Sequence, residues 1–378
     1  MSVKIEINKD IVRWALSRAG YREEEFDSVF PQIKPWLSRE KKPTIKQLAD
    51  FSRRVAIPFG YLFLDKPPEE KIPIPYFRTK GESKITLNVL DTIKLLQNRQ
   101  VWLRDYLKEN KNSPLDFVGR FKDINNYKII AEDIKKTFQL PEKWASNFNT
   151  WKKTLEDLSN RTEEIGIVIV FNSVVGNNTH RPIEVEECRG FVLVNSYAPF
   201  MFVNSADVKA AQLFTIVHEL AHIWIGQSAA FDLRGMLPAD DPKEKLCDKV
   251  AAEFLVPELL FDKEWDKSKD SDNLSKISDL SQFFRVSQIV IARRALDLGK
   301  IQKDVFFNFY NQYKKQEYHK REEAESGNFY RTQKKRLGLP FARFVHQAVR
   351  ESKLLYRDAY YLTGLFGETY QKFINNYL

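Results

Sequence analysis

The chain has 378 residues, of which 43% are hydrophobic, and its formal net charge is +9. This length and composition are typical of a folded protein with two or three domains, and no apolar run approaches the roughly 20 residues that a membrane span needs. The N-terminus is charged and lacks the apolar core of a signal peptide, so we expect a cytoplasmic protein without membrane contact. The two cysteines, Cys188 and Cys247, have no spacing that suggests disulfides or a zinc knuckle.

The basic excess lies at the two ends of the chain. Residues 1–66 hold 13 Lys+Arg against 9 Asp+Glu, and residues 300–378 hold 15 against 8, whereas the middle is slightly acidic. Such ends are compatible with contact to nucleic acid or an acidic partner, and equally with an ordinary solvated surface.

Residues 1–66 are expected to form a small helical domain. Apolar residues recur at helical spacing in residues 9–20, 23–30 and 43–57, and Thr44 is the expected N-cap of the third helix. A helix that reads DNA presents polar side chains near its N-terminal end. Side chains that could contact DNA, or simply form a solvated face, are Lys46, Gln47, Arg53 and Arg54.

A proline-rich segment follows this domain. Four prolines fall between residues 65 and 80, which leaves little that could form regular structure. We therefore expect residues 67–84 to form a stiff, largely extended linker.

Residues 85–299 are expected to combine helices with a small sheet. Apolar periodicity predicts helices over residues 86–107, 124–138 and 144–161. The pattern then changes to β-branched and aromatic runs bounded by turns, which predict strands and a short antiparallel or mixed sheet. These runs cover residues 165–171, 190–194 and 200–203.

The most informative motif combines His218, Glu219 and His222. Residues four apart share one face of a helix, so both rings could hold one ion at about 2 Å. This H-E-x-x-H pattern is that of zinc-dependent hydrolases, in which the glutamate activates water. The flanking residues are apolar nearly all round, and Gly226 is a plausible helix end. The alternative, two ordinary core histidines, would require partners for a buried carboxylate.

A third ligand is expected from a later helix. Glu244 and Asp248 lie one helical turn apart, which suits a ligand and a carboxylate that orients a ligating imidazole. Glu253 is the competing third ligand. We prefer Glu244, because Asp248 accompanies it.

Two regions follow this motif. Residues 274–298 predict two helices joined at residues 285–287, with Gln288, Arg293 and Arg294 facing outward, either as a second helix-turn-helix or as a structural pair. Residues 300–378 are aromatic and basic, and we expect a helical C-terminal domain whose rings pack in a core rather than stack on bases, with a loop over residues 322–327.

Several of these motifs together resemble the ImmA/IrrE family of zinc metallopeptidases. The peptidase part shares a strand that ends in Phe202-Val-Asn204, the H-E-x-x-H run after Phe214-Thr-Ile-Val217, and the segment from Glu244 to Pro257. The chain departs from the family pattern at Asp248, where Asn is common, and at Gln212, where a basic residue is common. The N-terminal part resembles the helix-turn-helix, repressor-like domain that often precedes the peptidase, through Trp36-Leu37, Pro43-Thr44, Gln47-Leu48 and Pro58–Leu64.

The fold expected from these observations is α+β and predominantly α-helical. The resemblance implies an endopeptidase that uses Zn²⁺ to cleave or inactivate a repressor-like protein in mobile-element, stress-response or toxin–antitoxin regulation. DNA contact through residues 1–66 is the further partner it suggests. The alternative is a DNA-binding or antitoxin-like interaction protein in which the metal site is largely structural.

Overall fold

The computed structural model describes residues 4–21, 23–68, 86–231, 241–267, 272–317 and 329–378. The chain divides into a smaller unit, residues 1–73 with 84–90, and a larger unit, residues 74–83 with 91–378. Nearly all of the expected linker, and the expected loop at 322–327, lie outside the described residues. The proposed domain boundaries therefore stay predictions.

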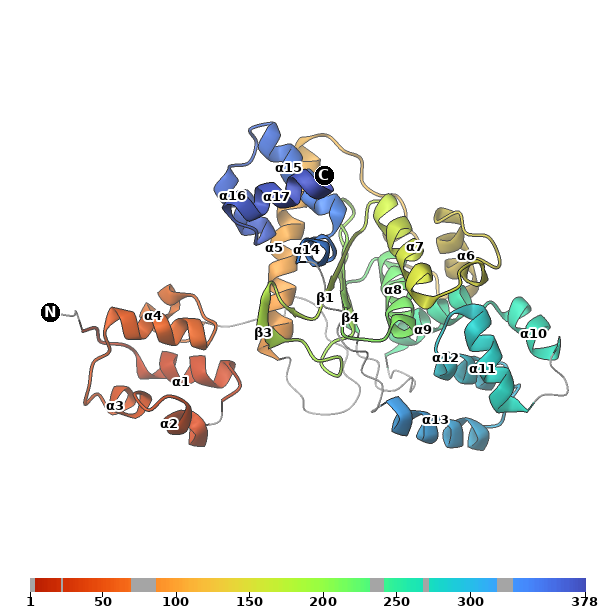
Figure 1. Cartoon of the computed structure of the whole chain (residues 1–378), viewed down its shortest axis with the longest axis horizontal. Helices are drawn as coiled ribbons and strands as arrows, with labels where there is room; N and C mark the ends of the chain where they lie inside the picture. The colour runs from red at the N-terminus through yellow and green to blue at the C-terminus, as the bar shows by residue number, and fades with distance from the viewer. Residues whose placement is uncertain (1–3, 22, 69–85, 232–240, 268–271, 318–328) are drawn as a thin grey trace. The chain divides into compact units, whose positions relative to one another are not determined.

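The smaller unit is built from short helices (Figure 1). These are α1 (Lys9–Arg18), α2 (Phe26–Val29), α3 (Ile33–Leu37) and α4 (Ile45–Arg54), followed by a 3₁₀ turn over Phe59–Phe63. The expected N-cap at Thr44 is confirmed, because its hydroxyl accepts from the backbone N–H of Gln47 while the Gln47 side chain accepts from the Thr44 N–H. Buried apolar residues from α1, α3 and α4 share one core, among them Ile11, Leu16, Trp36, Leu48 and Phe51.

The larger unit contains a mixed sheet of four strands in the order β1-β5-β4-β6. The strands are β1 (Val168–Asn172), β4 (Gly190–Leu193), β5 (Phe200–Asn204) and β6 (Ala229–Phe231). β1 and β5 run parallel, whereas β4 is antiparallel to both β5 and β6. A separate hairpin pairs β2 (Val174–Val175) with β3 (Asn178–Pro182).

Helices cover both faces of the sheet (Figure 1). On one face, Ile169, Val192 and Met201 join the core that contains α7 (Trp151–Glu164) and α8 (Lys209–Ile225). On the other face, the rings of Phe191 and Phe202 stack with their centroids 4.9 Å apart. The ring of Phe200 packs edge-on against that of Phe341 in α15 (Leu339–Arg350), with a centroid distance of 5.6 Å. Because both faces are covered, the strands lack the alternation of polar and apolar residues that one exposed face would impose.

The remaining helices complete a predominantly helical α+β fold, as expected from the sequence. The expected helices over residues 86–107 and 124–138 are present as α5 (Leu87–Glu109) and α6 (Tyr127–Thr137). The helix expected from residue 144 starts later, because residues 145–147 form a 3₁₀ turn and Thr150 caps α7. The others are α9 (Pro242–Leu255), α10 (Glu258–Lys267), α11 (Asn273–Phe284), α12 (Gln288–Asp297), α13 (Lys303–Glu317), α14 (Phe329–Leu337), α16 (Tyr356–Thr363) and α17 (Gly367–Tyr377).

The aromatic residues of the C-terminal region are divided between the core and the surface. Among the described residues, the expected core packing holds for Phe341 but is wrong for Tyr356 and Tyr361, which are 52% and 79% exposed. Phe306 of α13 joins the core around α8, while Phe341 and Phe373 are buried in α15 and α17. None of the helices in the described part of the chain has both the length and the apolar character that crossing a membrane requires.

Candidate metal centre

The two histidines lie on α8, which is buried on all sides. Every residue from Gln212 to Ile225 is buried, because the sheet covers one side of the helix and other helices cover the rest. The helix ends at Gly226, whose left-handed backbone (φ 73°) allows its N–H to reach the carbonyls of the last turn. The expected helix end is therefore confirmed.

The acidic partners come from α9, which packs against α8. Asp241 caps this helix by accepting from the N–H groups of Lys243 and Glu244, and Pro242 occupies its first turn. Glu244 thus projects from a rigid first turn, with Asp248 one turn later on the same helix face.

The structure brings His218, His222 and Glu244 together. Nε2 of His218 lies 3.1 Å from Oε2 of Glu244 and 3.1 Å from Nε2 of His222, and Nε2 of His222 lies 3.2 Å from Oε1 of Glu244. Tetrahedral ligands at about 2.0 Å from one ion would be about 3.3 Å apart, so the spacing of these three atoms fits a zinc-sized ion. They form the candidate metal-binding group found among the described residues.

The chemistry of the cluster also requires a positive charge. Asp248 Oδ1 lies 3.0 Å from Nδ1 of His218, which favours the tautomer that donates from Nδ1 to this carboxylate. Nε2 of His218 then turns a lone pair toward the Glu244 carboxylate, which can only accept. Two acceptors at hydrogen-bond distance repel each other unless a proton or a cation lies between them.

The pKa values of these groups show the same need for positive charge. Burial lowers the pKa of His218, but hydrogen bonds with Asp248 and Glu244 outweigh burial and raise that pKa to about 10. Burial raises the pKa of Glu244, but its hydrogen bonds with the two rings outweigh burial and lower it. Burial lowers the pKa of His222. The protein groups alone therefore hold a proton on His218, which a divalent cation would have to displace.

Glu219 lies next to this cluster and is fully buried. Neither of its carboxylate oxygens has a hydrogen-bond partner among the described residues. Burial raises its pKa well above that of an exposed glutamate, and the nearby Glu244 adds to this effect. A buried carboxylate without partners is costly, which makes Glu219 a candidate for a chemical role.

The competing third ligand, Glu253, has a different partner. Its carboxylate forms an ion pair with Arg294 of α12, whose side chain is 5% exposed. The expectation that Arg294 faces outward is therefore wrong, because this residue turns inward and neutralises a glutamate of α9. The helical pair itself is confirmed, since α11 and α12 are joined at residues 285–287.

The four candidate DNA contacts all lie on α4. Gln47 closes the capping box, Arg53 forms an ion pair with Asp50, and the Arg54 guanidinium lies 4.3 Å from the centre of the Phe30 ring. Lys46 is exposed. DNA contact by these residues stays a prediction.

Two histidines and a glutamate on two packed helices, with a second buried glutamate beside them and a mixed sheet next to α8, define a zincin-like candidate metal centre. Residues 162–296, a little over a third of the chain, match the Peptidase M78 family, described as the IrrE N-terminal-like domain. This match supports both the resemblance to the ImmA/IrrE family and a peptidase role for this part of the chain. Residues 337–376 match a domain of unknown function, DUF8813. No curated protein and no solved structure matches the chain.

Proposed function

We propose that this chain is a zinc-dependent endopeptidase of the H-E-x-x-H gluzincin type. The observation that carries the proposal is the meeting of His218, His222 and Glu244 beside the buried carboxylate of Glu219, which has no hydrogen-bond partner in the part of the chain that the structure describes. A purely structural metal site would not need the carboxylate of Glu219. Hydrolysis of a peptide bond, in contrast, needs a base next to the metal.

The roles of the residues follow from their contacts. His218, His222 and Glu244 would hold Zn²⁺, and Asp248 orients the His218 ring through Nδ1. When bound, Zn²⁺ would polarise the scissile carbonyl and lower the pKa of water. The Glu219 carboxylate is available to accept a proton from the attacking water and to donate it to the leaving amine.

The substrate we propose is a specific regulatory protein, such as a transcriptional repressor in mobile-element, stress-response or toxin–antitoxin control. The match of residues 162–296 to the IrrE N-terminal-like domain supports this choice, together with the helix-turn-helix resemblance of residues 1–66. The N-terminal unit would then contribute to recognition of the target or of DNA.

The test compares Glu219→Gln with the unchanged chain. Each is produced together with the proteins encoded by the neighbouring genes as candidate substrates, and cleavage is followed by mass spectrometry. We expect Glu219→Gln to retain its zinc and to cleave at least ~100-fold more slowly, because the base is lost while the ligands remain. Glu132→Gln, at an exposed position of α6, is the control and should cleave normally. Equal cleavage by Glu219→Gln would contradict the proposal.

A second candidate function is a DNA-binding or antitoxin-like protein with a largely structural zinc site. The observation in its favour is that His218, Glu219 and His222 are fully buried and Glu244 is only 4% exposed, as structural zinc sites tend to be closed. It predicts that the full chain binds its own promoter DNA specifically, that Glu219→Gln leaves this binding unchanged, and that no protein substrate is cleaved.

A further inference from the structure

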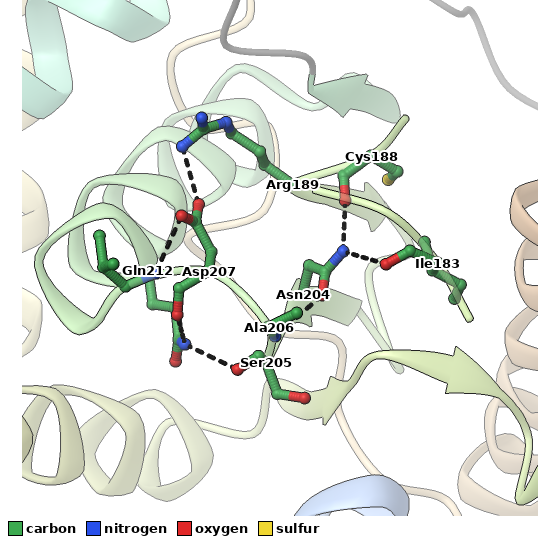
Figure 2. Close-up of polar contacts among 9 residues, drawn as sticks. Ile183, Cys188, Arg189, Asn204, Ser205, Ala206, Asp207 and Gln212 are labelled. Atoms are coloured by element: carbon green, nitrogen blue, oxygen red, sulfur yellow. Dashed lines mark hydrogen bonds and ion pairs between the residues drawn. The ribbon is translucent and has the colours of Figure 1, made fainter. Parts of the chain in front are cut away.

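Buried polar side chains gather where β5 ends and α8 begins (Figure 2). Asn204, the last residue of β5, is fully buried. Its Nδ2 donates to the carbonyl oxygens of Ile183 and Cys188, each at 2.9 Å, and its Oδ1 accepts from the N–H of Ala206 at 3.0 Å. One carboxamide therefore joins the end of β5 both to the segment before β4 and to the segment before α8.

Two further contacts hold the start of α8 in the same network (Figure 2). Nη1 of Arg189 lies 2.8 Å from Oδ2 of Asp207, and the two side chains are 21% and 8% exposed. Gln212, in the first turn of α8, donates to the backbone carbonyls of Ser205 and Asp207. Hydrogen bonds and an ion pair therefore hold both ends of the segment that connects β5 to α8.

The segment that Asn204 holds leads directly into Gly190, the first residue of β4. A Cβ atom placed on Gly190 would lie 2.4 Å from Cγ2 of Thr215 and 3.5 Å from Oε1 of Glu219. Thr215 and Glu219 are four residues apart and share one face of α8. This face of α8 therefore packs directly against the backbone of Gly190.

Packing is what places the Glu219 carboxylate. Because neither oxygen accepts a hydrogen bond from a described residue, the carboxylate is oriented by the surfaces that touch it. A displacement of Gly190 would change the space available to Oε1 of Glu219, while the three metal-binding side chains would keep their own contacts.

We infer that Asn204 is a positioning residue for Glu219. Asn204 holds the segment that leads into β4, and the Arg189–Asp207 pair holds the start of α8. Together these contacts fix the position of Gly190 relative to the face of α8 that carries Thr215 and Glu219. This inference rests on the proposed function, in which Glu219 acts beside the metal.

The neighbouring strand offers a matched control. Asn172 ends β1 and is paired with Asn204 in the parallel register of β1 and β5. It is 6% exposed, donates to the carbonyl of Gly176 at 2.8 Å and accepts from the N–H groups of Ser173 and Val174. Asn172 therefore has a similar environment and similar bonds, but it holds the β1–β2 turn instead of the segment before Gly190.

The experiment measures the affinity of acetohydroxamate for the zinc-loaded full chain by calorimetry, together with zinc content and melting temperature. A hydroxamate chelates zinc and gives its hydroxyl proton to an adjacent carboxylate, so its affinity reports on the position of Glu219. We expect Asn204→Ala to bind acetohydroxamate about tenfold more weakly with its zinc content unchanged, and Asn172→Ala to bind normally. Equal affinities for the two variants would overturn the positioning role.

A milder pair of variants covers the case in which Asn204→Ala does not fold. Arg189→Gln should weaken acetohydroxamate binding about threefold, a smaller effect because the carboxamide of Asn204 remains. Its control is Arg181→Gln, since Arg181 forms a pair of similar burial with Asp91 at 2.7 Å. Normal binding by Arg189→Gln in that case would overturn the inference.

Glu219→Gln separates this inference from the proposed function. If Glu219→Gln weakens acetohydroxamate binding but the Asn204 and Arg189 variants do not, only the positioning role is wrong. If Glu219→Gln binds acetohydroxamate as tightly as the unchanged chain, Glu219 does not act beside the metal, and both proposals are wrong.

Discussion

The two ends of α9 each carry a buried or nearly buried glutamate, and the two glutamates meet different partners. Near the N-terminal end, the Glu244 carboxylate faces the Nε2 atoms of His218 and His222 at 3.1 and 3.2 Å. Near the C-terminal end, the carboxylate of Glu253 pairs with the guanidinium of Arg294. The two residues are of the same type, lie on the same helix and are buried to a similar depth. They therefore differ mainly in the side chains that contact them.

This difference separates a candidate metal ligand, Glu244, from a glutamate in a structural ion pair, Glu253. Arginine carries a permanent positive charge, so the charge of Glu253 is already neutralised by Arg294 and its carboxylate would attract a metal ion only weakly. Imidazole is neutral in its ligating form, so Glu244 and the two histidines together present lone pairs that a divalent cation satisfies. The partner of a buried carboxylate therefore indicates its role better than its burial does.

The largest expected effect distinguishes the two glutamates directly. Glu244→Gln should weaken zinc binding on the order of 100-fold or more, because it removes one of the three proposed ligands and the negative charge of the candidate site. Glu253→Gln should bind zinc as the unchanged chain does. Competition with a chromophoric chelator measures both affinities, and similar losses in the two variants would remove the distinction.

The next effect concerns stability at the other end of α9. Arg294→Met should lower the free energy of unfolding by about 2 kcal/mol, because it leaves the Glu253 carboxylate, whose side chain is 14% exposed, without its cation. Zinc affinity should not change. The double variant with Glu253→Leu should recover most of the loss in urea denaturation. An Arg294→Met variant as stable as the unchanged chain would show that the pair contributes nothing.

A smaller effect is expected at Asp248, whose side chain is 29% exposed. Asp248→Ala should weaken zinc binding about tenfold, because the His218 ring loses the partner that sets its tautomer and orientation. The zinc affinity of Asp248→Asn should stay within about threefold of that of the unchanged chain, since an amide oxygen can accept the same hydrogen bond from Nδ1 of His218. A larger loss for Asn than for Ala would show that the charge of Asp248 acts in another way.

The smallest effect concerns Glu163, a glutamate of α7 without an arginine or histidine partner at hydrogen-bond distance among the described residues. Burial raises its pKa to about 7, although the N–H of Leu339 donates to it. The folded state thus binds this proton more tightly than the unfolded state, so its contribution to stability is present at low pH and is lost as the pH rises toward 7.

Glu163→Gln should remove that dependence. Relative to the unchanged chain, the variant should gain on the order of 1 kcal/mol between pH 6 and pH 7, measured by urea denaturation at both values. Glu156→Gln, at an exposed position of the same helix, is the control and should follow the unchanged chain. An identical difference between the two pH values in all three proteins would contradict the assignment.

Local chemistry made several elements predictable from the sequence. The helix that carries H-E-x-x-H, its end at Gly226, the N-cap at Thr44 and the joined pair α11–α12 depend on residues within a few positions of one another. The three longer strands of the sheet were also expected, because each is a continuous apolar run. The edge strand β6 was not, since it is short and depends on pairing with β4, which is distant in sequence. The hairpin β2–β3 was not either, since β2 has two residues and β3 is a polar, largely exposed segment.

The sequence by itself determined that two histidines and a glutamate share one helix. Only the tertiary structure decided which carboxylate reaches them, because Glu244 and Glu253 lie on one helix and both spacings were compatible with a ligand. The packing of α9 on α8 brings Glu244 to the rings, and the packing of α12 gives Glu253 an arginine. Tertiary packing also places Gly190 against Glu219 and brings Asn204 to the carbonyls of Ile183 and Cys188, which lie 21 and 16 residues away along the chain.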